Sequence, residues 1–248
     1  EMDKIIVISN HSKNTYQQTV VEAVNEATQE KTLIHCETPM TVVNYPVRTH
    51  ETEELEDLEL DYDFNFLTVA QSSPRKNLQN TIQWFIEEFK DDEVGLIVKT
   101  NLAKDSVVDR GYAAAALEGL MQSYPDRKCK IYLLHGTLSE GNLKWLYTHD
   151  KIKSLISLSH GEGFGLPMFE AAWNGLPLIT TSWSGQTDFI KAPNKSGKSK
   201  PHIAKVEHDL RPVQPEAVWE GVIEADSMWA FPREQSYKRA LRSMYKTH

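Results

Sequence analysis

The sequence predicts an α/β protein with a doubly wound parallel sheet of the Rossmann-like kind. Short apolar runs such as VGLIVKT (94–100) and KSLISLS (153–159) have the length of buried strands. Segments with apolar residues at spacings of three and four lie between these runs, so helices are expected there. Strands that alternate with helices form a parallel sheet covered on both faces, and right-handed crossovers make it doubly wound.

Residues 1–49 are expected to hold a strand, a helix and two further short strands. The first strand is KIIVIS (4–9), and Asn10 or Ser12 can cap the helix that follows. The apolar positions of this helix are Tyr16, Val20, Val21, Val24 and Ala27. TLIHC and TVVNYPV are the short strands. Residues 50–63 carry eight carboxylates and are interpreted as an acidic, solvated linker, with a cation-binding run as the alternative.

From residue 64 the alternation becomes regular, and residues 64–212 are expected to form one Rossmann-like domain. The expected strands are 64–70, 94–100, 129–135, 153–159 and 176–181, with helices after 78, over 106–122, over 139–148 and from Leu166. Residues 213–248 are expected to form C-terminal helices. The last of these begins at Pro232 and carries Tyr237, Leu241, Met244 and Tyr245 on one face.

Composition excludes several classes of function. A net charge of −8 argues against a nucleic-acid-binding surface. No run approaches the roughly 20 apolar residues that a membrane span needs. Cys36 and Cys129 lie far apart without metal-ligand spacing, which favours a reducing, cytoplasmic compartment.

The stretch GEGFGLPMFEAAWNGLPLIT (161–180) is the strongest candidate for a binding site. It follows a strand, and ligands of open α/β sheets bind at the carboxyl ends of strands. Its glycines let the backbone approach a ligand, and a helix starting near Leu166, with Pro167 at its first position, offers free N–H groups to a phosphate. Glu162 and Glu170 can accept hydroxyl groups of a ribose or a hexose. A purely structural strand–helix turn is the alternative.

The segment SHGEGFGLPMFEAAWNGLPLITTSWSGQTDFI (159–190) resembles the signature of retaining glycosyltransferases with the GT-B fold, of the family-4 or group 1 type. Three further segments agree: MDKIIVISNHSKNTY with the end of that family's N-terminal domain, FNFLTVAQSSPRKNL with its first C-terminal-domain strand and basic loop, and SMWAFPREQSYKRALRSMY with its closing helices. The resemblance implies that residues 1–49 end a truncated acceptor-side domain and that 64–212 bind the donor. It also implies that the final helix crosses back between the domains.

The resemblance also implies roles for individual residues. Glu162 would hold hydroxyls of the donor sugar and Glu170 those of the ribose, with backbone N–H groups contacting the sugar and the diphosphate. Lys76 would bind the donor phosphates, and Arg75 would share or replace that role. Gln71 departs from the family, which often has a second basic residue there. The backbone contacts come from Gly163, Phe164, Gly165 and Leu166.

Further candidates lie at neighbouring strand ends. The segment LLHGTL matches the family's base pocket through His135, Gly136 and Thr137, although His135 is equally a candidate core histidine. Lys99 ends its strand on the same edge and could face the phosphates. Ser184, Gly185 and Asp188 match a turn that faces the donor, and His160 is expected to orient the loop. The lysine-rich run KAPNKSGKSKP (191–201) is interpreted as an exposed loop, with contact to an anionic acceptor or a membrane surface as the alternative.

The implied reaction is transfer of a hexosyl group from a nucleoside-diphosphate sugar to an acceptor hydroxyl, with retention of configuration. The donor would be of the UDP, GDP or ADP type, and the acceptor a glycan, lipid or protein. No metal or other cofactor is expected, because basic side chains and a helix terminus would carry the charge. The alternative is a non-catalytic nucleotide-sugar-binding domain or partner subunit. An NAD-dependent oxidoreductase is excluded, because VAQSSPRKNL has no glycine where a dinucleotide fingerprint needs three.

Overall fold

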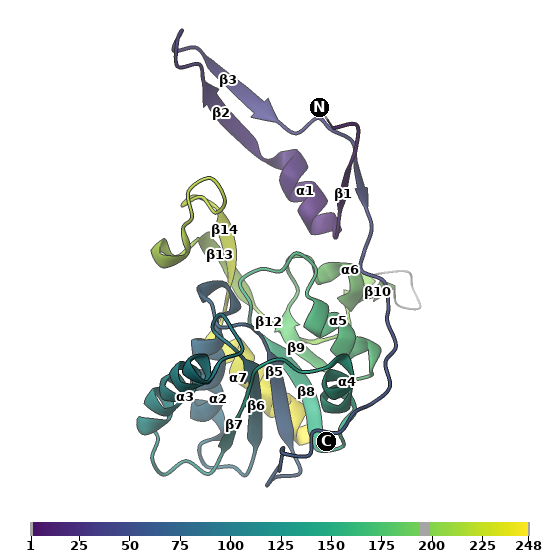
Figure 1. Cartoon of the computed structure of the whole chain (residues 1–248), viewed down its shortest axis with the longest axis vertical. Coiled ribbons are helices and arrows are strands. Elements are labelled where there is room, and N and C mark those ends of the chain that lie inside the picture. The colour runs from purple at the N-terminus through teal and green to yellow at the C-terminus, as the bar shows by residue number, and fades with distance from the viewer. Residues whose placement is uncertain (1, 194–198, 248) are drawn as a thin grey trace.

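The computed structural model describes residues 2–193 and 199–247 (Figure 1). Within them, one parallel sheet has the strand order β12-β9-β8-β5-β6-β7. Its strands are β5 (Asn65–Val69), β6 (Gly95–Thr100), β7 (Lys130–His135), β8 (Ile152–Ser157), β9 (Leu178–Thr181) and β12 (Ala204–Val206). From β5 the chain builds the sheet outward first in one direction and then in the other, so the predicted doubly wound fold is confirmed.

Helices cover both faces of this sheet. Successive residues of each strand point to opposite faces, so each strand contributes side chains to two cores. Phe66 faces a core built with α2 (Leu78–Phe89), α3 (Val107–Gln122) and α7 (Glu234–Thr247). Leu67 faces a second core built with α4 (Glu140–Thr148) and α5 (Leu166–Trp173). Phe66 and Leu67 are fully buried, as the predicted apolar strands require.

The N-terminal segment differs from its prediction after residue 18. Strands β1 (Ile5–Val7) and β4 (Met40–Val42) pair in parallel, and α1 spans Asn10–Gln18. The predicted helix through Val24 and Ala27 is wrong, because β2 (Val20–Val24) forms an antiparallel hairpin with β3 (Lys31–His35). β-branched valines favour a strand, and a turn at 25–29 with Gln29 at a φ of 59° closes the hairpin. Ser9 is the N-cap of α1, not Asn10 or Ser12.

The acidic run 50–63 contains no helix or strand, but it is packed along the Rossmann-like domain rather than free (Figure 1). Leu55, Leu58 and Leu60 lie against the second core. Asp61 forms an ion pair of 2.8 Å with Lys130, at the edge of the sheet opposite to the strands' carboxyl ends. The apolar residues of this run hold it against the domain, while its carboxylates face solvent.

The sequence predicts helices over residues 213–248, but this part of the structure is only partly helical. β13 (His208–Pro212) and β14 (Met228–Pro232) form an antiparallel hairpin, and the loop between them holds a short 3-10 helix, η2 (Pro215–Ala217). The last helix, α7, begins at Glu234, and Tyr237 and Leu241 are buried against α2. None of the helices in the described residues combines the length and the apolar character that a bilayer-spanning segment needs.

Three shorter elements complete the chain. The turn η1 (Pro74–Lys76) follows β5, and α6 (Thr187–Ile190) follows β9. Strands β10 (Lys191–Pro193) and β11 (Ser199–Pro201) pair with each other. The centre of the lysine-rich run, 194–198, lies outside the described residues, so the interpretation of that run stays a prediction.

Candidate functional site

The candidate site lies where the strand order reverses, at the carboxyl ends of β5 and β8. These strands are neighbours in the sheet, but they are followed by helices on opposite faces. The turn η1 follows β5, and the glycine-rich loop 160–165 follows β8. Open α/β sheets bind ligands at such a switch point, because the two connections diverge there. The fold therefore brings the predicted SPRKN and GEGFG segments together.

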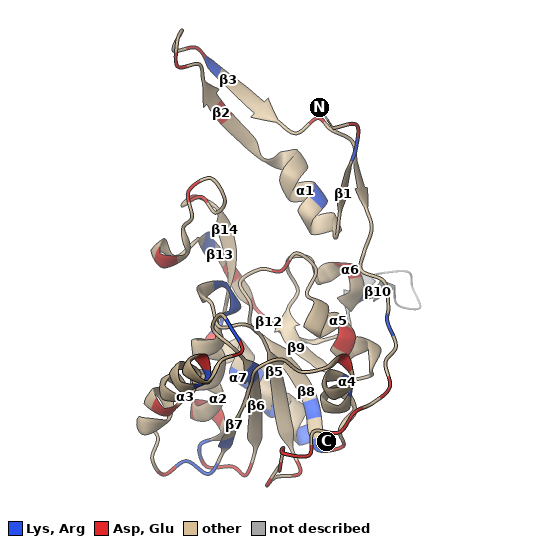
Figure 2. Cartoon of the chain, in the orientation of Figure 1, with Lys and Arg blue, Asp and Glu red and all other residues tan. Residues whose placement is uncertain are grey.

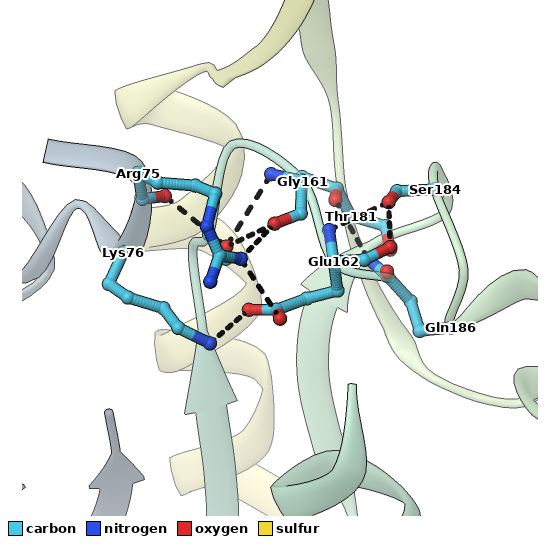
Figure 3. Close-up of polar contacts among 8 residues, drawn as sticks. Arg75, Lys76, Gly161, Glu162, Thr181, Ser184 and Gln186 are labelled. Carbon is cyan, nitrogen blue, oxygen red and sulfur yellow. Dashed lines mark hydrogen bonds and ion pairs between the residues drawn. The ribbon is translucent and has the colours of Figure 1, made fainter. Parts of the chain in front are cut away.

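Glu162 is held by two cations from η1 (Figure 3). Its Oε1 lies 2.5 Å from Lys76 Nζ, and its Oε2 lies 3.1 Å from Arg75 Nη1. Arg75 also donates to the carbonyl of Gly161 at 2.5 Å. The side chain of Glu162 is only 9% exposed, whereas that of Arg75 is 40% exposed. The result is a nearly buried carboxylate with one shielded and one accessible cation beside it.

This arrangement keeps Glu162 ionised. Burial alone would raise the pKa of Glu162, but the charges of Lys76 and Arg75 outweigh it and hold the pKa below its usual range. Gln71 takes no part in this cluster, because its amide donates to the carbonyl of Leu102 at 2.8 Å. The second cation of the cluster is therefore Arg75, the neighbour of Lys76 that the sequence analysis expects to share its role.

Hydrogen bonds fix the loop that carries Glu162. The backbone N–H of Glu162 donates to Ser184 Oγ at 2.7 Å, and the Ser184 hydroxyl donates back to the Glu162 carbonyl at 2.5 Å. The N–H of Gly185 donates to the same carbonyl at 2.9 Å. A side chain at 185 would place its Cβ 2.0 Å from the carbonyl oxygen of Gly163, so this close approach requires glycine. The turn at 184–185 thus holds the glycine-rich loop in place through these hydrogen bonds.

The start of α5 has the form that the sequence predicted. Gly165 precedes the helix with a φ of 91°, a conformation that favours glycine. Leu166 is the first helical residue, and Pro167 lies one position further in than predicted. Phe164 turns inward and packs its ring against Tyr45, Phe169 and Phe189. The side chain of Phe164 therefore anchors the loop, and only its backbone is left for a ligand.

Glu170 lies in a cavity of about 310 Å³ between α4, α5 and the segment 45–50. Leu166 and Trp173 line the same cavity. The Tyr147 hydroxyl donates to Glu170 Oε2 at 3.3 Å. Burial and the neighbouring Glu140 raise the pKa of Glu170 despite this hydrogen bond. Glu162 is thus paired with two cations, whereas Glu170 accepts a hydrogen bond from Tyr147 in a cavity that Arg48 and Lys144 also line.

The base-pocket candidates form a second polar cluster at the ends of β6 and β7. His135 Nε2 lies 2.7 Å from Asp109 Oδ1, and both side chains are buried, which is the packing role that the sequence left open. Thr137 donates its N–H to Asp105 Oδ2 at 2.8 Å, and Gly136 lies against the same carboxylate. These contacts join the loop after β6 to the loop after β7.

Lys99 lies near this second cluster rather than with Arg75 and Lys76. Burial lowers the pKa of Lys99, against the attraction of Asp105. The predicted site residues thus fall into three groups: those around Glu162, those around Glu170, and those at the ends of β6 and β7.

Asp109 is a functional-site neighbour that the sequence analysis missed. Its carboxylate accepts N–H groups of Leu102, Ala103 and Lys104 at 2.8–2.9 Å, in addition to its contact with His135. These hydrogen bonds lower the pKa of Asp109. The spacing of Ser106, the N-cap of α3, and Asp109 three residues later was the available signal.

The N-terminal segment contacts the candidate site through Asp188. Its Oδ2 accepts the N–H of Asn10 at 2.9 Å and the side-chain amides of Asn10 and Asn44 at 3.1 Å. His11 meets the ring of Trp183 edge-on, with centroids 4.9 Å apart. Residues near the start of the chain are thereby fixed beside the glycine-rich loop.

Comparison with known proteins agrees with the fold and with the sequence signature. No protein-family model matches the chain. Over 118 residues, 46% of this chain, it is 31% identical to the serotype-specific mannosyltransferase WbdA of Escherichia coli. The chain spans 13% of the length of that relative.

Among solved structures, two examples resemble nearly the whole chain. One is the GtfA/B complex, with a TM-score of 0.51, 16% identity, and coverage of 98% of this chain and 39% of that one. The other is an E. coli protein described as trehalose-6-phosphate bound with UDP-2-fluoro glucose, with a TM-score of 0.53, 11% identity, and coverage of 99% and 53%. The chain has the Rossmann-like fold of GT-B glycosyltransferases, and part of its sequence is similar to that of a bacterial mannosyltransferase.

Proposed function

We propose that the chain is the donor-binding part of a glycosyltransferase that moves a hexosyl group from a nucleoside-diphosphate sugar to an acceptor hydroxyl. The observation that carries the proposal is the ionised Glu162 between Lys76 and Arg75 at the switch point of the sheet. A buried carboxylate and two cations suit a ligand that is both hydroxylated and anionic. A nucleoside-diphosphate sugar has both properties.

The ion pairs suggest how such a donor enters. A diphosphate competes with Glu162 for Lys76 and Arg75, since phosphate oxygens are strong acceptors for both cations. Glu162 is then released to accept hydroxyl groups of the sugar. The N-terminus of α5 adds N–H donors and a partial positive charge to the same place. We propose that this set of charges serves the diphosphate without a metal ion.

In the reaction, the acceptor hydroxyl oxygen forms a bond to the anomeric carbon while the bond from that carbon to the diphosphate oxygen breaks. The bonding electrons leave with the diphosphate, and the hydroxyl proton passes to a departing phosphate oxygen. Lys76 and Arg75 stabilise the charge that develops on the diphosphate, which is usually a large term in catalysis. Because both oxygens lie on one face of the sugar in this scheme, the anomeric configuration is retained.

Glu170 suits the nucleoside end of the donor. Its cavity of about 310 Å³ is within the size range of small-molecule sites. The carboxylate can accept two vicinal ribose hydroxyls, and Tyr147 orients it. The UDP sugar bound to the fold neighbour and the mannosyl activity in the name of the sequence relative make UDP- and mannose-containing donors the first to test. The cytoplasmic location stays a prediction.

The test is incubation of the chain with UDP-glucose, GDP-mannose and ADP-glucose, with release of the nucleoside diphosphate followed by NMR. We expect slow release of the nucleoside diphosphate from one of the three donors, as its sugar is transferred to water or to an added sugar. Glu162→Gln should abolish this release. An α-configured product from an α-linked donor supports retention. Binding without any release favours the non-catalytic nucleotide-sugar-binding domain instead.

A further inference from the structure

The hairpin β13–β14 places an ordered loop beside the candidate site. Its loop, residues 213–227, contains η2, which lies next to η1, the turn that carries Arg75 and Lys76. Figure 1 shows this hairpin extending beyond the carboxyl edge of the parallel sheet. The loop therefore belongs to the same side of the molecule as Glu162. None of the roles proposed above uses it.

His160 fixes the hairpin to the glycine-rich loop. The N–H of Ala230 donates to the His160 carbonyl at 3.0 Å, and His160 Nδ1–H donates to the Ala230 carbonyl at 2.7 Å. The imidazole stacks on Trp229, with planes 15° apart, and contacts Phe231. Burial lowers the pKa of His160, which favours the neutral ring, and Nδ1 carries the proton that it donates to the Ala230 carbonyl. Glu162 lies two residues after His160, so the glycine-rich loop holds both the hairpin and the Glu162 carboxylate.

The loop also has its own internal structure. The N–H of Trp219 donates to the Ile223 carbonyl at 2.9 Å, and the N–H of Ile223 donates back at 2.7 Å. Gly221 N–H donates to Glu224 Oε1 at 2.7 Å and closes the turn. The Trp219 side chain is nevertheless 66% exposed. An ordered backbone thus presents a large aromatic ring to solvent, on the loop whose η2 lies next to η1.

The chemistry of the loop surface is aromatic and acidic. Trp219, Val218 and Val222 are exposed apolar residues. Residues 213–228 include four carboxylates and no lysine or arginine. Figure 2 shows acidic residues on this loop and basic residues on the turn beneath it. The carboxylates are Glu216, Glu220, Glu224 and Asp226.

This combination selects among acceptor chemistries. An anionic lipid surface or a phosphorylated acceptor would meet four negative charges, which oppose its approach. A neutral sugar has an apolar face of C–H groups that packs on an indole ring, and hydroxyl groups that donate to carboxylates. In the proposed donor complex, Arg75 and Lys76 behind the loop bind the diphosphate of the donor. The surface beside that diphosphate is therefore complementary to a neutral, polyhydroxylated ring.

We propose that hairpin β13–β14 forms one wall of the acceptor site, and that the acceptor is a neutral carbohydrate that stacks on Trp219 and donates hydroxyls to Glu216 or Glu220. This inference rests on the proposed glycosyltransferase function. It assigns acceptor recognition to an element of the donor-binding part of the chain. His160 is the positioning residue that couples this wall to Glu162.

The test follows the tryptophan indole N–H signals of the 15N-labelled chain by NMR. The probes are three neutral oligosaccharides at millimolar concentration, mannotriose, maltotriose and lactose, and vesicles of phosphatidylglycerol. The Trp219 signal, identified by its loss in Trp219→Ala, is expected to shift with at least one oligosaccharide. Trp219→Ala should weaken that binding by about tenfold, and Glu220→Gln should weaken it without affecting the fold.

The matched control is Tyr112→Ala, which removes an equally exposed aromatic side chain, also 66% exposed, from α3. This variant should bind the oligosaccharide as the parent does. The inference is overturned when no oligosaccharide shifts the Trp219 signal, or when only the vesicles do. Binding of UDP, GDP or ADP is measured in the same samples. Nucleotide binding without an oligosaccharide response contradicts only the acceptor wall, whereas absence of both contradicts the proposed function itself.

Discussion

Lys76 Nζ lies 2.5 Å from Glu162 Oε1, although 86 positions separate the two residues in the chain. The sheet order explains this proximity, because β5 and β8 are neighbours and the two residues follow their carboxyl ends. Arg75 completes the cluster at 3.1 Å. The cluster defines a place where the cations can bind an anion and the carboxylate can accept a hydroxyl group.

Glu162→Gln should affect the affinity for a nucleoside diphosphate and the rate of sugar transfer in opposite directions. In the parent protein, Glu162 competes with a diphosphate for Lys76 and Arg75, so its neutralisation should raise the affinity for a nucleoside diphosphate several-fold. Release of the diphosphate from the nucleotide sugar should fall at least about 100-fold, because the sugar loses its carboxylate partner. Titration calorimetry and a release assay measure the two effects. Glu118→Gln on the exposed side of α3 is the control, and weaker diphosphate binding by Glu162→Gln would refute the competition.

Glu170 should make nucleoside binding sensitive to acid. Its pKa is raised above the ordinary 4.5 by burial and by Glu140. Only the carboxylate accepts two ribose hydroxyls, so affinity should fall as the pH falls through this raised pKa. Titrations between about pH 8 and about pH 5 should show the loss in the parent, whereas Glu170→Gln should bind weakly throughout without that pH dependence.

A measurement of the unfolding temperature distinguishes the loss of nucleoside binding from a loss of the fold. Because the folded pKa of Glu170 is raised, its ionisation opposes folding as the pH rises above the unfolded pKa. Glu170→Gln should therefore be at least as stable as the parent at neutral pH. An affinity loss accompanied by a lower unfolding temperature would show that the carboxylate is needed for folding rather than for binding.

Asp109→Asn should loosen the loops beside the second cluster. The carboxylate accepts three backbone N–H groups and contacts His135, and an amide cannot accept all of these hydrogen bonds. We expect faster amide hydrogen exchange at residues 102–104 and a lower unfolding temperature. Asp126→Asn, at an exposed position, should change neither quantity. Unchanged exchange at 102–104 would mean that the loop is held by its other contacts.

Asp188→Ala should release the N-terminal segment from the site. Asp188 accepts three hydrogen bonds from Asn10 and Asn44, and the substitution removes all three. Limited proteolysis should cut the chain before residue 50 more rapidly in this variant, while the Rossmann-like domain stays intact. Asp57→Ala, in the acidic run, is the control. Equal cutting rates would show that the packing of Tyr45 on Phe164 suffices to hold the segment.

The sequence predicts the parallel sheet well because its strands carry an unambiguous signal. The runs ending at Thr100, His135 and Ser159 carry apolar residues at consecutive central positions, a pattern typical of a strand covered on both faces. The same holds for the glycine-rich loop, since the left-handed backbone at Gly165 favours glycine. Glu162, Lys76 and Arg75 were predicted individually, and the sheet order then brings them together.

Other features depend on contacts that no local pattern encodes. Val20, Val21 and Val24 fit a helix face as well as a strand, and the hairpin with β3 decides between them. Likewise Met228–Pro232 is a strand only because β13 lies beside it. The distant contacts of Asp109 with His135 and of Asp188 with Asn10 join residues 26 and 178 positions apart. Such pairs are visible only once the topology is known.

The most direct test of the central claim is calorimetric titration of the chain with UDP, GDP and ADP, repeated with Lys76→Ala. The account predicts that one nucleotide binds the parent and that Lys76→Ala weakens this binding by about tenfold or more, through loss of a charge-assisted contact to the diphosphate. Lys128→Ala, which removes an exposed lysine at the opposite edge of the sheet, should leave the affinity unchanged. Binding of none of the three nucleotides to the folded chain, or equal binding by parent and Lys76→Ala, would contradict a donor site between Lys76 and Glu162.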